Sequence, residues 1–379
     1  MTQRIDFPLI VLAAGGTGGH VFPAEALAVE MMSRGYRLAL VTDRRGGGYG
    51  GTLGELETHR IRAGGIAGKG LTQRVESVFE LGLGTLQARG LLARLKPGAV
   101  VGFGGYASVP TMMAATWSGR ATVIHEQNAV LGRANRLLVP RVRVIATSLD
   151  ATQAIPEQAQ SKVVLTGMPV RPQVIQAGET PYPAYDEASP ISILITGGSQ
   201  GATVLSKVVP AALARLDAKI KWRLRVTQQC RSEDLDDVRR VYADAVIQAE
   251  LSHFFDDVPK RLAGAHLVIA RAGASTVAEC TAAGRPAILV PYPHAIDGHQ
   301  MANAQAVDEA GAGWLMAEDI FTPDQLANQL SSLLGGGMYL KQAAKAAKRM
   351  GRPDAAKRLA DTVVAVMSNG GSGEGRVAA

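Results

Sequence analysis

Two glycine-rich stretches carry the clearest chemistry in this sequence. "LIVLAAGGTGGH" (9–20) and "ISILITGGSQGA" (191–202) each run from an apolar segment into a cluster of glycines. Where a strand ends in glycines and a helix follows, unpaired backbone N–H groups point at one spot, and the helix N-terminus adds about half a positive charge. Glycine lets an anion approach such a backbone closely, so phosphate is the usual occupant. The same pattern twice predicts one anion-binding edge in each of two domains.

A third stretch, "RAGASTVAEC" (271–280), follows the apolar run "HLVIA" and opens a helix. Ser275 and Thr276 suit an N-cap or a phosphate contact. Glu279 lies one turn into the helix, where a carboxylate can accept hydrogen bonds from both hydroxyls of a ribose. Glu279 also fits a capping box with Ser275 or Thr276, so both interpretations stay open.

Amide side chains follow in "DGHQMANA" (297–304), where His299, Gln300 and Asn303 lie within one turn. Amides suit sugar hydroxyls, which need both donors and acceptors. His294, Asp297 and His299 lack a further fixed ligand, so we predict neither a metal site nor a cofactor.

These residues need a scaffold of alternating strands and helices. Ten short apolar runs read as strands, and longer helical patterns such as "VPTMMAATW" (109–117) separate them. The ten runs are residues 9–14, 38–42, 99–103, 122–126, 142–147, 162–167, 191–196, 222–227, 266–270 and 286–291. Strands separated by helices indicate parallel sheets in an α/β fold. A chain of 379 residues exceeds one ordinary core, so we expect two Rossmann-like domains that face a cleft.

The domain limits follow from composition. Proline and polar residues interrupt the alternation at 166–190, which indicates the seam between the domains. We expect an N-terminal domain at 1–168, a nucleotide-binding domain at 169–350, a closing helix at 351–368 that packs back on the N-terminal domain, and a disordered tail at 369–379. Residues 97–119 carry no charge, but glycines and Pro110 break them up, so no transmembrane helix is predicted.

The net charge of +7 lies in the first half of the chain. Residues 1–170 hold 18 Lys and Arg against 11 Asp and Glu, whereas the remainder holds 22 of each. A chance asymmetry explains this as well as an anionic partner does, such as a lipid surface, a pyrophosphate or nucleic acid. Nucleic acid is the least favoured, because basic residues do not cluster and aromatic residues make up only 5%. Two cysteines, Cys230 and Cys280, and the lack of an export signal favour a reducing compartment.

Seven motifs in order resemble the MurG family of bacterial N-acetylglucosaminyltransferases. They are "GGTGGH", "GFGGYAS", "HEQNA", "GMPVR", "GGSQGA", "RAGASTVAE" and "DGHQMANA". The resemblance implies the glycosyltransferase B architecture and transfer of N-acetylglucosamine from UDP to the C4 hydroxyl of the muramoyl sugar of lipid I. It further implies inversion at the donor carbon, lipid II and UDP as products, and no metal.

The resemblance also implies roles for matching residues. Ser199 should face the diphosphate, Arg171 should border the nucleotide, and the backbone of Phe255 should contact uracil. Glu279 should bind the ribose, and Gln300 and Asn303 the sugar hydroxyls. The remaining donor contacts are expected from Thr17, Gly18, Gly19, Asn128, Ala274, Ser275, Thr276, Val277 and Ala278.

A single displacement also needs a base for the attacking hydroxyl, and three residues are candidates. His20 ranks first because it ends the first glycine loop, and Glu126 and His125 follow. His20 also fits a residue that only orients the loop or binds the acceptor phosphate. Gly104, Gly105 and Tyr106 either touch the acceptor pyrophosphate or shape the site.

The acceptor is a lipid, so the resemblance implies a peripheral protein on the cytoplasmic face of the inner membrane, in contact with anionic lipids. The stretch at 65–84 mixes basic and apolar residues, which fits a membrane-binding surface. It fits equally well an amphipathic helix packed on its own core. The residues expected at the membrane are Lys69, Arg74, Val75, Phe79 and Trp117, with Arg89 and Arg94 as further basic residues.

Three other functions remain open. A UDP-N-acetylglucosamine epimerase would bind the same donor without a lipid acceptor. An NAD(P)-dependent oxidoreductase would use the first loop with Asp43 on the ribose, although Val21 replaces the last glycine of the dinucleotide fingerprint. A sugar-nucleotide sensor would bind the donor without catalysis.

Overall fold

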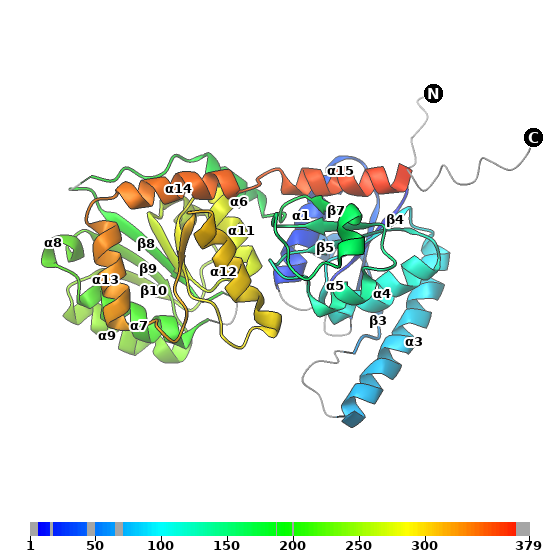
Figure 1. Ribbon diagram of the computed structural model, residues 1–379, viewed down its shortest axis with the longest axis horizontal. Helices are drawn as coiled ribbons and strands as arrows, with labels where there is room; N and C mark the ends of the chain where they lie inside the picture. The colour runs from blue at the N-terminus through cyan, green and yellow to red at the C-terminus, as the bar shows by residue number, and fades with distance from the viewer. Residues whose placement is uncertain are drawn as a thin grey trace, which may run out of the picture. The chain divides into compact units, whose positions relative to one another are not determined.

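The chain folds into two units, shown in the computed structural model of Figure 1. The structure describes residues 7–15, 18–43, 50–64, 71–186, 188–198 and 201–368, and for residues 71–76 the backbone alone. The first unit holds the described residues up to Pro169 together with those from Asp354 onward, and the second runs from Val170 to Pro353. The tail at 369–379 lies outside the described residues.

The sheet of the first unit has, in its described part, seven parallel strands in the order β3-β2-β1-β4-β5-β6-β7. The strands are β1 Ile10–Ala13, β2 Leu38–Asp43, β3 Glu57–Ile61, β4 Ala99–Gly102, β5 Ala121–Glu126, β6 Val144–Thr147 and β7 Val163–Leu165. Alternate residues of β1 enter opposite cores, Ile10 and Leu12 on one face and Val11 and Ala13 on the other. Burial on both faces explains why "IVLA" is apolar throughout.

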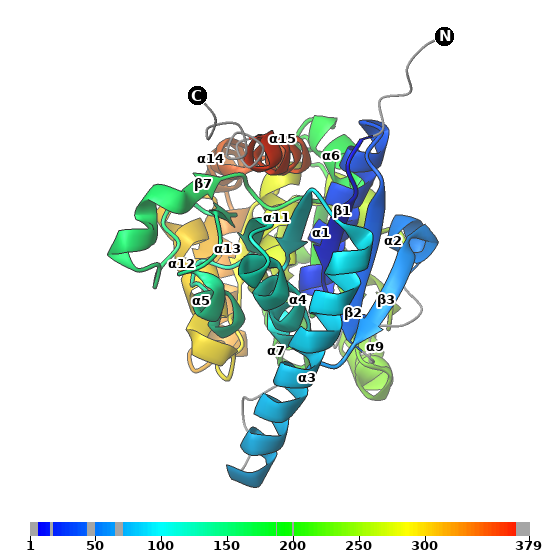
Figure 2. The same cartoon turned by 90° about the vertical axis from the view of Figure 1, so that its right-hand side faces the viewer.

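Helices cover both faces of this sheet. They are α1 Gly18–Ser33, α2 Gly51–Glu55, α3 Leu71–Leu95, α4 Gly105–Trp117, α5 Arg133–Leu138 and α15 Ala355–Ser368, with a 3-10 segment at Glu157–Lys162. Residues of α1, α2 and α15 share one core with the sheet, and those of α3, α4 and α5 share the other. Arg34, just after α1, ties α15 in place through an ion pair with Asp361 at 2.6 Å. Figure 2 shows α3 running past the end of the sheet.

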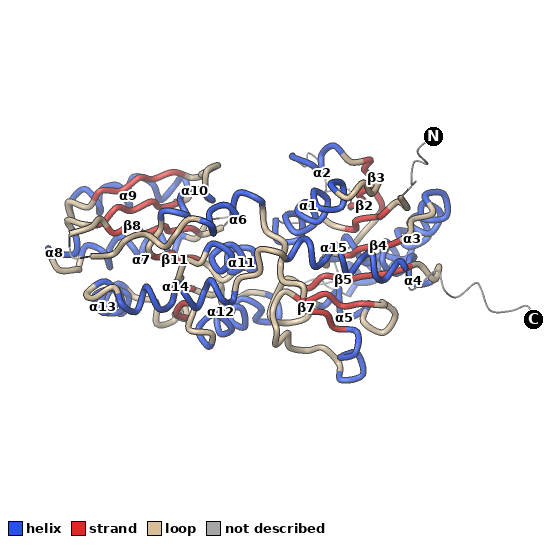
Figure 3. The backbone as a smooth tube through the Cα atoms, turned by 90° about the horizontal axis from the view of Figure 1, so that it is seen from above, coloured by secondary structure: helices blue, strands red, loops and turns tan. Residues whose placement is uncertain are grey.

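The sheet of the second unit has, among the described residues, six parallel strands in the order β10-β9-β8-β11-β12-β13 (Figure 3, strands in red). The strands are β8 Ile191–Thr196, β9 Leu224–Gln229, β10 Gln248–Ser252, β11 Leu267–Ala270, β12 Ala287–Leu289 and β13 Gly313–Leu315. The helices are α6 Pro172–Glu179, α7 Thr203–Ala214, α8 Ala218–Lys221, α9 Leu235–Asp244, α10 Val258–Gly264, α11 Ala274–Ala283, α12 His299–Glu309, α13 Pro323–Leu334 and α14 Met338–Met350. Short 3-10 segments lie at Ser232–Asp234 and Ile296–Gly298. Helices α7, α9 and α13 line one face, and α6, α10, α11 and α12 line the other.

All ten predicted strand segments contain a strand, which confirms the α/β fold with two parallel sheets. The sequence analysis missed β3, β10 and β13, which are edge strands. In each unit the strand order reverses beside the first strand, at β1 and at β8, so the loops after β1 and β4 and after β8 and β11 diverge there. Ligands of open parallel sheets bind at such points.

Among the described helices, none is both long enough and apolar enough to span a bilayer.

Arg285 is a fully buried cation that joins three segments of the second unit. Its side chain is 2% exposed and donates to backbone carbonyls only. The acceptors are Leu262 and Ala263 at the end of α10, Ala283 and Gly284 at the end of α11, and Thr180 and Pro181 before β8. Helix C-termini carry partial negative charge, so the guanidinium satisfies carbonyls that the helices leave unpaired.

We therefore expect Arg285→Met to destabilise the second unit by about 3–5 kcal/mol, because six backbone carbonyls around this buried side chain lose a hydrogen-bond donor. Urea unfolding of a Trp117→Phe background measures this, since Trp222 and Trp314 then report on the second unit alone. Arg239→Met is the matched control: Arg239 forms a surface pair with Asp236, and its loss should change stability by about 0.5 kcal/mol or less. Equal effects of the two substitutions would contradict the role of Arg285.

Candidate functional site

Three loops meet at the carboxyl edge of the first unit's sheet. Strands β1, β4 and β5 are neighbours. His20 lies in the first turn of α1 after β1, Gly104 and Gly105 lead from β4 into α4, and Gln127 directly follows β5. The parallel pairing therefore joins the motifs "GGTGGH", "GFGGYAS" and "HEQNA" into one site.

The imidazole of His20 lies against the backbone of Gly104 and Gly105. A Cβ at Gly104 would lie 3.4 Å from Cε1 of His20, and a Cβ at Gly105 would lie 3.3 Å from its Cδ2. The φ angles of the two glycines are 82° and 68°, a region that side chains rarely adopt. Both positions thus need glycine for the turn and for the close approach of the histidine. His20 itself is partly exposed.

A hydrogen-bond chain connects His20 to the interior. Its Nδ1 lies 3.1 Å from Oε1 of Gln127, whose Nε2 lies 3.0 Å from Nδ1 of His125. The Nε2 of His125 donates to the carbonyl of Gly167 at 3.0 Å. The sequence analysis quoted "HEQNA" but assigned no role to Gln127, which is 3% exposed.

The structure corrects the prediction that His125 is a candidate base. His125 is 0% exposed, and both of its ring nitrogens have partners inside the protein. Burial lowers the pKa of His125 to about 4, because the interior disfavours the charged ring. The ring is a neutral internal link and does not reach a substrate.

Glu126 is corrected in the same way. It is 2% exposed, and its carboxylate accepts four hydrogen bonds. Asn128 donates its backbone N–H and Nδ2 to Oε1, while the N–H of Gly132 and Nδ2 of Asn135 donate to Oε2 at 2.9 and 2.8 Å. A buried carboxylate must be satisfied in this way. Glu126 thus holds the loop after β5, which leaves His20 as the base candidate.

The remaining first-unit residues lie around His20. Gly18 and Gly19 begin α1, Tyr106 is a partly exposed residue of the first turn of α4, and Asn128 is partly exposed beside Glu126. Thr17 lies outside the described residues. Contacts of these residues with a sugar or a pyrophosphate stay predictions.

In the second unit, Glu279 is paired with Arg171. Nε and Nη2 of Arg171 both donate to Oε1 of Glu279, at 3.2 and 2.9 Å. Among the described residues, none donates to Oε2. The Glu279 side chain is 15% exposed, and burial raises its pKa while Arg171 opposes the shift. One carboxylate oxygen thus remains for a ligand hydroxyl.

The capping-box interpretation of Glu279 is wrong. Helix α11 has Gly273 as its N-cap, with no side chain bonded to the first turn. Ala274, Ser275 and Thr276 are partly exposed there, so their N–H groups offer an anion site. Val277 is 4% exposed and its N–H donates to the carbonyl of Gly273 at 3.0 Å, so this predicted contact faces the interior, whereas Ala278 is partly exposed beside the same core. Ser199 lies outside the described residues.

Phe255, the predicted uracil-contacting residue, is held by a cation. The guanidinium of Arg261 lies 4.1 Å from the centre of its ring. Arg261 also forms a bidentate pair with Glu250 at 2.6 and 2.8 Å and bonds Asp257. These bonds lower the pKa of both carboxyls. Arg261 therefore fixes the conformation of the loop at 253–257.

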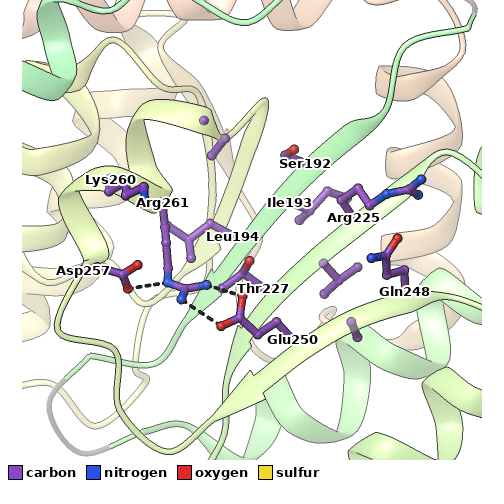
Figure 4. Close-up of a pocket in the computed structure, with 14 residues that line it drawn as sticks. Ser192, Ile193, Leu194, Arg225, Thr227, Gln248, Glu250, Asp257, Lys260 and Arg261 are labelled. Atoms are coloured by element: carbon purple, nitrogen blue, oxygen red, sulfur yellow. Dashed lines mark hydrogen bonds and ion pairs between the residues drawn. The ribbon is translucent and has the colours of Figure 1, made fainter.

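Arg261 and Glu250 also line a polar pocket of about 450 Å3 (Figure 4). The pocket is bounded by α10 and by the first halves of β8, β9 and β10, with Arg225, Gln248 and Lys260 at its wall. The pocket therefore begins away from the carboxyl edge of the sheet.

The two amides of α12 differ in their surroundings. Oε1 of Gln300 accepts from the N–H of Tyr292 at 2.9 Å, and no described residue is bonded to its Nε2. The predicted contact of Gln300 with a sugar stays a prediction, for which Nε2 is the donor. Asn303 is 0% exposed and donates to the carbonyl of Ala272 at 3.0 Å, so the prediction of a direct sugar contact is corrected: Asn303 fixes the turn before α11.

Arg271 was missed by the sequence analysis. Its Nη1 donates to the carbonyls of Val290 and Pro291, both at 3.2 Å, and pairs with Glu318 at 2.5 Å. Arg271 thereby ties the "RAGAST" turn to the loop that carries Gln300. Its place directly after the strand "HLVIA" was the available signal, since motif residues at a strand's carboxyl end are candidates for positioning.

Helix α3 presents apolar side chains to solvent. Val78, Phe79 and Leu86 are 59%, 64% and 65% exposed, and Trp117 at the end of α4 is 56% exposed. The opposite face of α3 is buried through Ala88, Leu91 and Leu92. Arg74 and Val75 belong to α3, but their side chains are outside the described part, as is Lys69 altogether.

The described part of the chain holds no group of three or more His, Cys, Asp or Glu residues that could bind a metal ion.

Comparison with known proteins matches a different domain model to each of the two units. Models of the glycosyltransferase family 28 N-terminal and C-terminal domains match residues 10–147 and 192–359. A relative from Paramagnetospirillum magneticum, named UDP-N-acetylglucosamine--N-acetylmuramyl-(pentapeptide) pyrophosphoryl-undecaprenol N-acetylglucosamine transferase, is 59% identical over 96% of this chain and 98% of its own. One of the same name from Rhodospirillum rubrum is 56% identical over 95% and 93%. The crystal structure of Acinetobacter baumannii MurG aligns with a TM-score of 0.76 at 29% identity, covering 94% of this chain and 99% of that one.

The neutral His125 makes the first unit sensitive to acid. The unfolded chain takes a proton at this ring below its ordinary pKa near 6.5, whereas the folded chain resists protonation down to about pH 4. Stability must therefore fall as the pH falls through this window. We expect the first unit to lose roughly 2–3 kcal/mol between pH 7 and pH 4.5. Urea unfolding followed by hydrogen exchange in β5 and β6 peptides measures it.

His125→Gln should show a smaller loss over that window, since it has no proton to gain. Replacement of the exposed His253 in the second unit is the control. An unchanged acid sensitivity of β5 and β6 in His125→Gln would refute the assignment.

Proposed function

This chain belongs to the family of UDP-N-acetylglucosamine--N-acetylmuramyl-(pentapeptide) pyrophosphoryl-undecaprenol N-acetylglucosamine transferases, and on that premise we propose the reaction, its site residues and its place in the cell. The chain transfers N-acetylglucosamine from UDP-N-acetylglucosamine to the C4 hydroxyl of the muramoyl sugar of lipid I. The products are lipid II and UDP, and the donor carbon inverts. The observation that carries this function is 59% identity along nearly the whole of a relative of that name.

The second unit supplies the donor site of this proposal. The uncapped first turn of α11 offers N–H groups to the diphosphate, where negative charge grows as UDP leaves. Oε2 of Glu279 accepts from the ribose, Nε2 of Gln300 donates to the sugar, and the backbone at Phe255, held by Arg261, contacts the base.

The first unit supplies the base. The C4 oxygen of the acceptor attacks the anomeric carbon, the bond from that carbon to the phosphate oxygen breaks, and its electron pair leaves with UDP. His20 takes the hydroxyl proton. General base catalysis of this kind raises the rate by about 100- to 10,000-fold. Of the three base candidates from the sequence, His20 alone combines partial exposure with a site position, because His125 and Glu126 are buried.

The structure also weighs on the oxidoreductase alternative. That function relied on Asp43 as a ribose-binding acid, but Asp43 is 1% exposed and a Cβ at Gly15 would lie 3.6 Å from its Oδ1. A side chain buried under the first loop does not meet a ribose. The epimerase and sensor alternatives lack support from relatives of this identity.

The lipid acceptor requires access to a membrane, and α3 is the candidate surface. Phe79 and Leu86 lie seven residues apart on one helix face, and Arg89 follows on that face. Apolar side chains enter the headgroup region, and basic residues near anionic lipids add roughly 1 kcal/mol each. The protein then binds peripherally to the cytoplasmic face of the inner membrane.

The test of the function is transfer of labelled N-acetylglucosamine from UDP to a short-chain lipid I analogue. We expect UDP release that depends on the analogue. His20→Ala should lower kcat about 100-fold or more and leave the KM for UDP-N-acetylglucosamine within about twofold, since the base acts on the acceptor hydroxyl.

Turnover of the UDP-sugar without lipid would favour an epimerase over a transferase. An unchanged kcat with a raised KM in His20→Ala would remove the base assignment and leave the transfer function standing.

The membrane surface is tested with liposome sedimentation. We expect Phe79→Ser and Leu86→Ser each to weaken binding to anionic vesicles by about 3- to 10-fold, through the loss of buried apolar area. High salt should release the wild type. Trp222→Ser is the matched control, because Trp222 is 59% exposed on the second unit. Equal losses for all three variants, or binding indifferent to salt and lipid charge, would exclude the surface.

A further inference from the structure

Gln127 lies between the two histidines of the first unit and has its amide orientation fixed by carbonyl groups. Nε2 of Gln127 lies 3.0 Å from the carbonyl oxygens of both Phe103 and His125. Carbonyl oxygens only accept hydrogen bonds, so the NH2 end of the amide must face them. The opposite orientation would set the amide oxygen against two other oxygens in a buried site.

The amide orientation determines which nitrogen of His20 carries the proton. Oε1 of Gln127 faces Nδ1 of His20 at 3.1 Å and, as an oxygen, accepts. Nδ1 of His20 must therefore be an N–H. In the neutral ring the lone pair then resides on Nε2, which is the atom that takes a proton when the ring acts as a base.

A second chain of bonds keeps Gln127 itself in place. The Gly167 carbonyl accepts from Nε2 of His125, so Nδ1 of that buried ring carries a lone pair toward Gln127. Because burial keeps His125 neutral, this direction of donation persists at neutral pH. The direction of donation along the chain of bonds is thus set by the backbone carbonyls of Phe103, His125 and Gly167, at the carboxyl ends of β4, β5 and β7.

The glycines opposite the ring agree with this direction. A Cβ at Gly105 would lie 3.4 Å from Nε2 of His20. A side chain there would be in van der Waals contact with the nitrogen to which the acceptor hydroxyl has to come.

We propose that Gln127 is a positioning residue that locks His20 in the Nδ1–H tautomer and so presents Nε2 as the base toward the acceptor hydroxyl. This inference rests on the proposed role of His20 in transfer. Histidine in water favours the Nε2–H tautomer, which has no lone pair on Nε2. The hydrogen bond that His20 donates to Gln127 therefore reverses the intrinsic preference of the ring.

The tautomer is measured by NMR of protein labelled with 15N-histidine, at pH 8.5 and without substrate. The chain has seven histidines, and His20→Asn identifies the resonances of His20. We expect an unprotonated Nε2 and a protonated Nδ1 in the wild type. Gln127→Met, which fills the same space without an acceptor, should shift His20 toward Nε2–H.

Two variants separate this role from a general loss of structure. Gln127→Glu, protonated at the oxygen that faces the Phe103 and His125 carbonyls, still presents an acceptor oxygen to His20, so it should keep the wild-type tautomer. Asn135→Ala removes a different buried donor, on α5, that bonds His125 O and Glu126, and it should also keep the tautomer. A tautomer change in Asn135→Ala equal to that in Gln127→Met would overturn the proposal.

Transfer kinetics complete the test. We expect Gln127→Met to lower kcat about 10- to 100-fold with the KM for UDP-N-acetylglucosamine within about twofold, and Gln127→Glu to restore most of kcat. A wild-type His20 protonated at Nε2, or a Gln127→Met variant with the wild-type tautomer or kcat, would overturn the proposal. If the wild type fails to transfer the sugar, the proposed function fails, whereas the NMR result still decides what Gln127 does to His20.

Discussion

The parallel pairing of β1, β4 and β5 is the constraint on which the first unit's site depends. Ala13 pairs with Gly102, and Gly102 pairs with Ile124, so the three strands end nearly level. The segments that follow β1, β4 and β5 must then lie together at one edge of the sheet. His20, the two glycines at 104 and 105, and Gln127 come together for this reason, although more than one hundred residues separate the first from the last.

The first unit's site separates buried polar residues that hold its loops from His20, the proposed base. The carboxylate of Glu126 accepts from four N–H groups, three in the following loop and one on α5, and both ring nitrogens of His125 are bonded, to Gly167 and Gln127. Buried polar groups must be satisfied, and full satisfaction makes them rigid and unreactive. His20 has its Nδ1 bonded to the loop and its ring partly exposed. Rigidity behind a single reactive nitrogen is what general base catalysis requires of a protein.

The sequence predicted every strand that lies inside the sheets and one edge strand, β7, and it missed the other three edge strands. "IVLA" and "LVIA" are apolar because both of their faces are buried, and this leaves a clear signal. "ETHRI" and "QAELS" pair on one side only and are mostly exposed, so their residues do not differ from loop residues. The same limit applied to the site. The motifs located "HEQNA" and "RAGASTVAE", but the sequence did not show that His125 and Glu126 are buried. It also did not show that Arg171 bonds Glu279, because the two residues are 108 positions apart in the sequence.

The Arg171–Glu279 pair bears on the proposed ribose contact of Glu279. Burial alone raises the pKa of Glu279, and a protonated carboxyl would offer a donor where the ribose hydroxyls need an acceptor. Arg171 opposes that shift while it uses Oε1 only, so Oε2 keeps its lone pairs. Arg171 lies at the start of α6, immediately after the chain enters the second unit. Both members of the pair therefore belong to the second unit. In both units, then, a neighbouring side chain bonds the atom opposite the one proposed to meet the substrate: Gln127 at Nδ1 of His20, and Arg171 at Oε1 of Glu279.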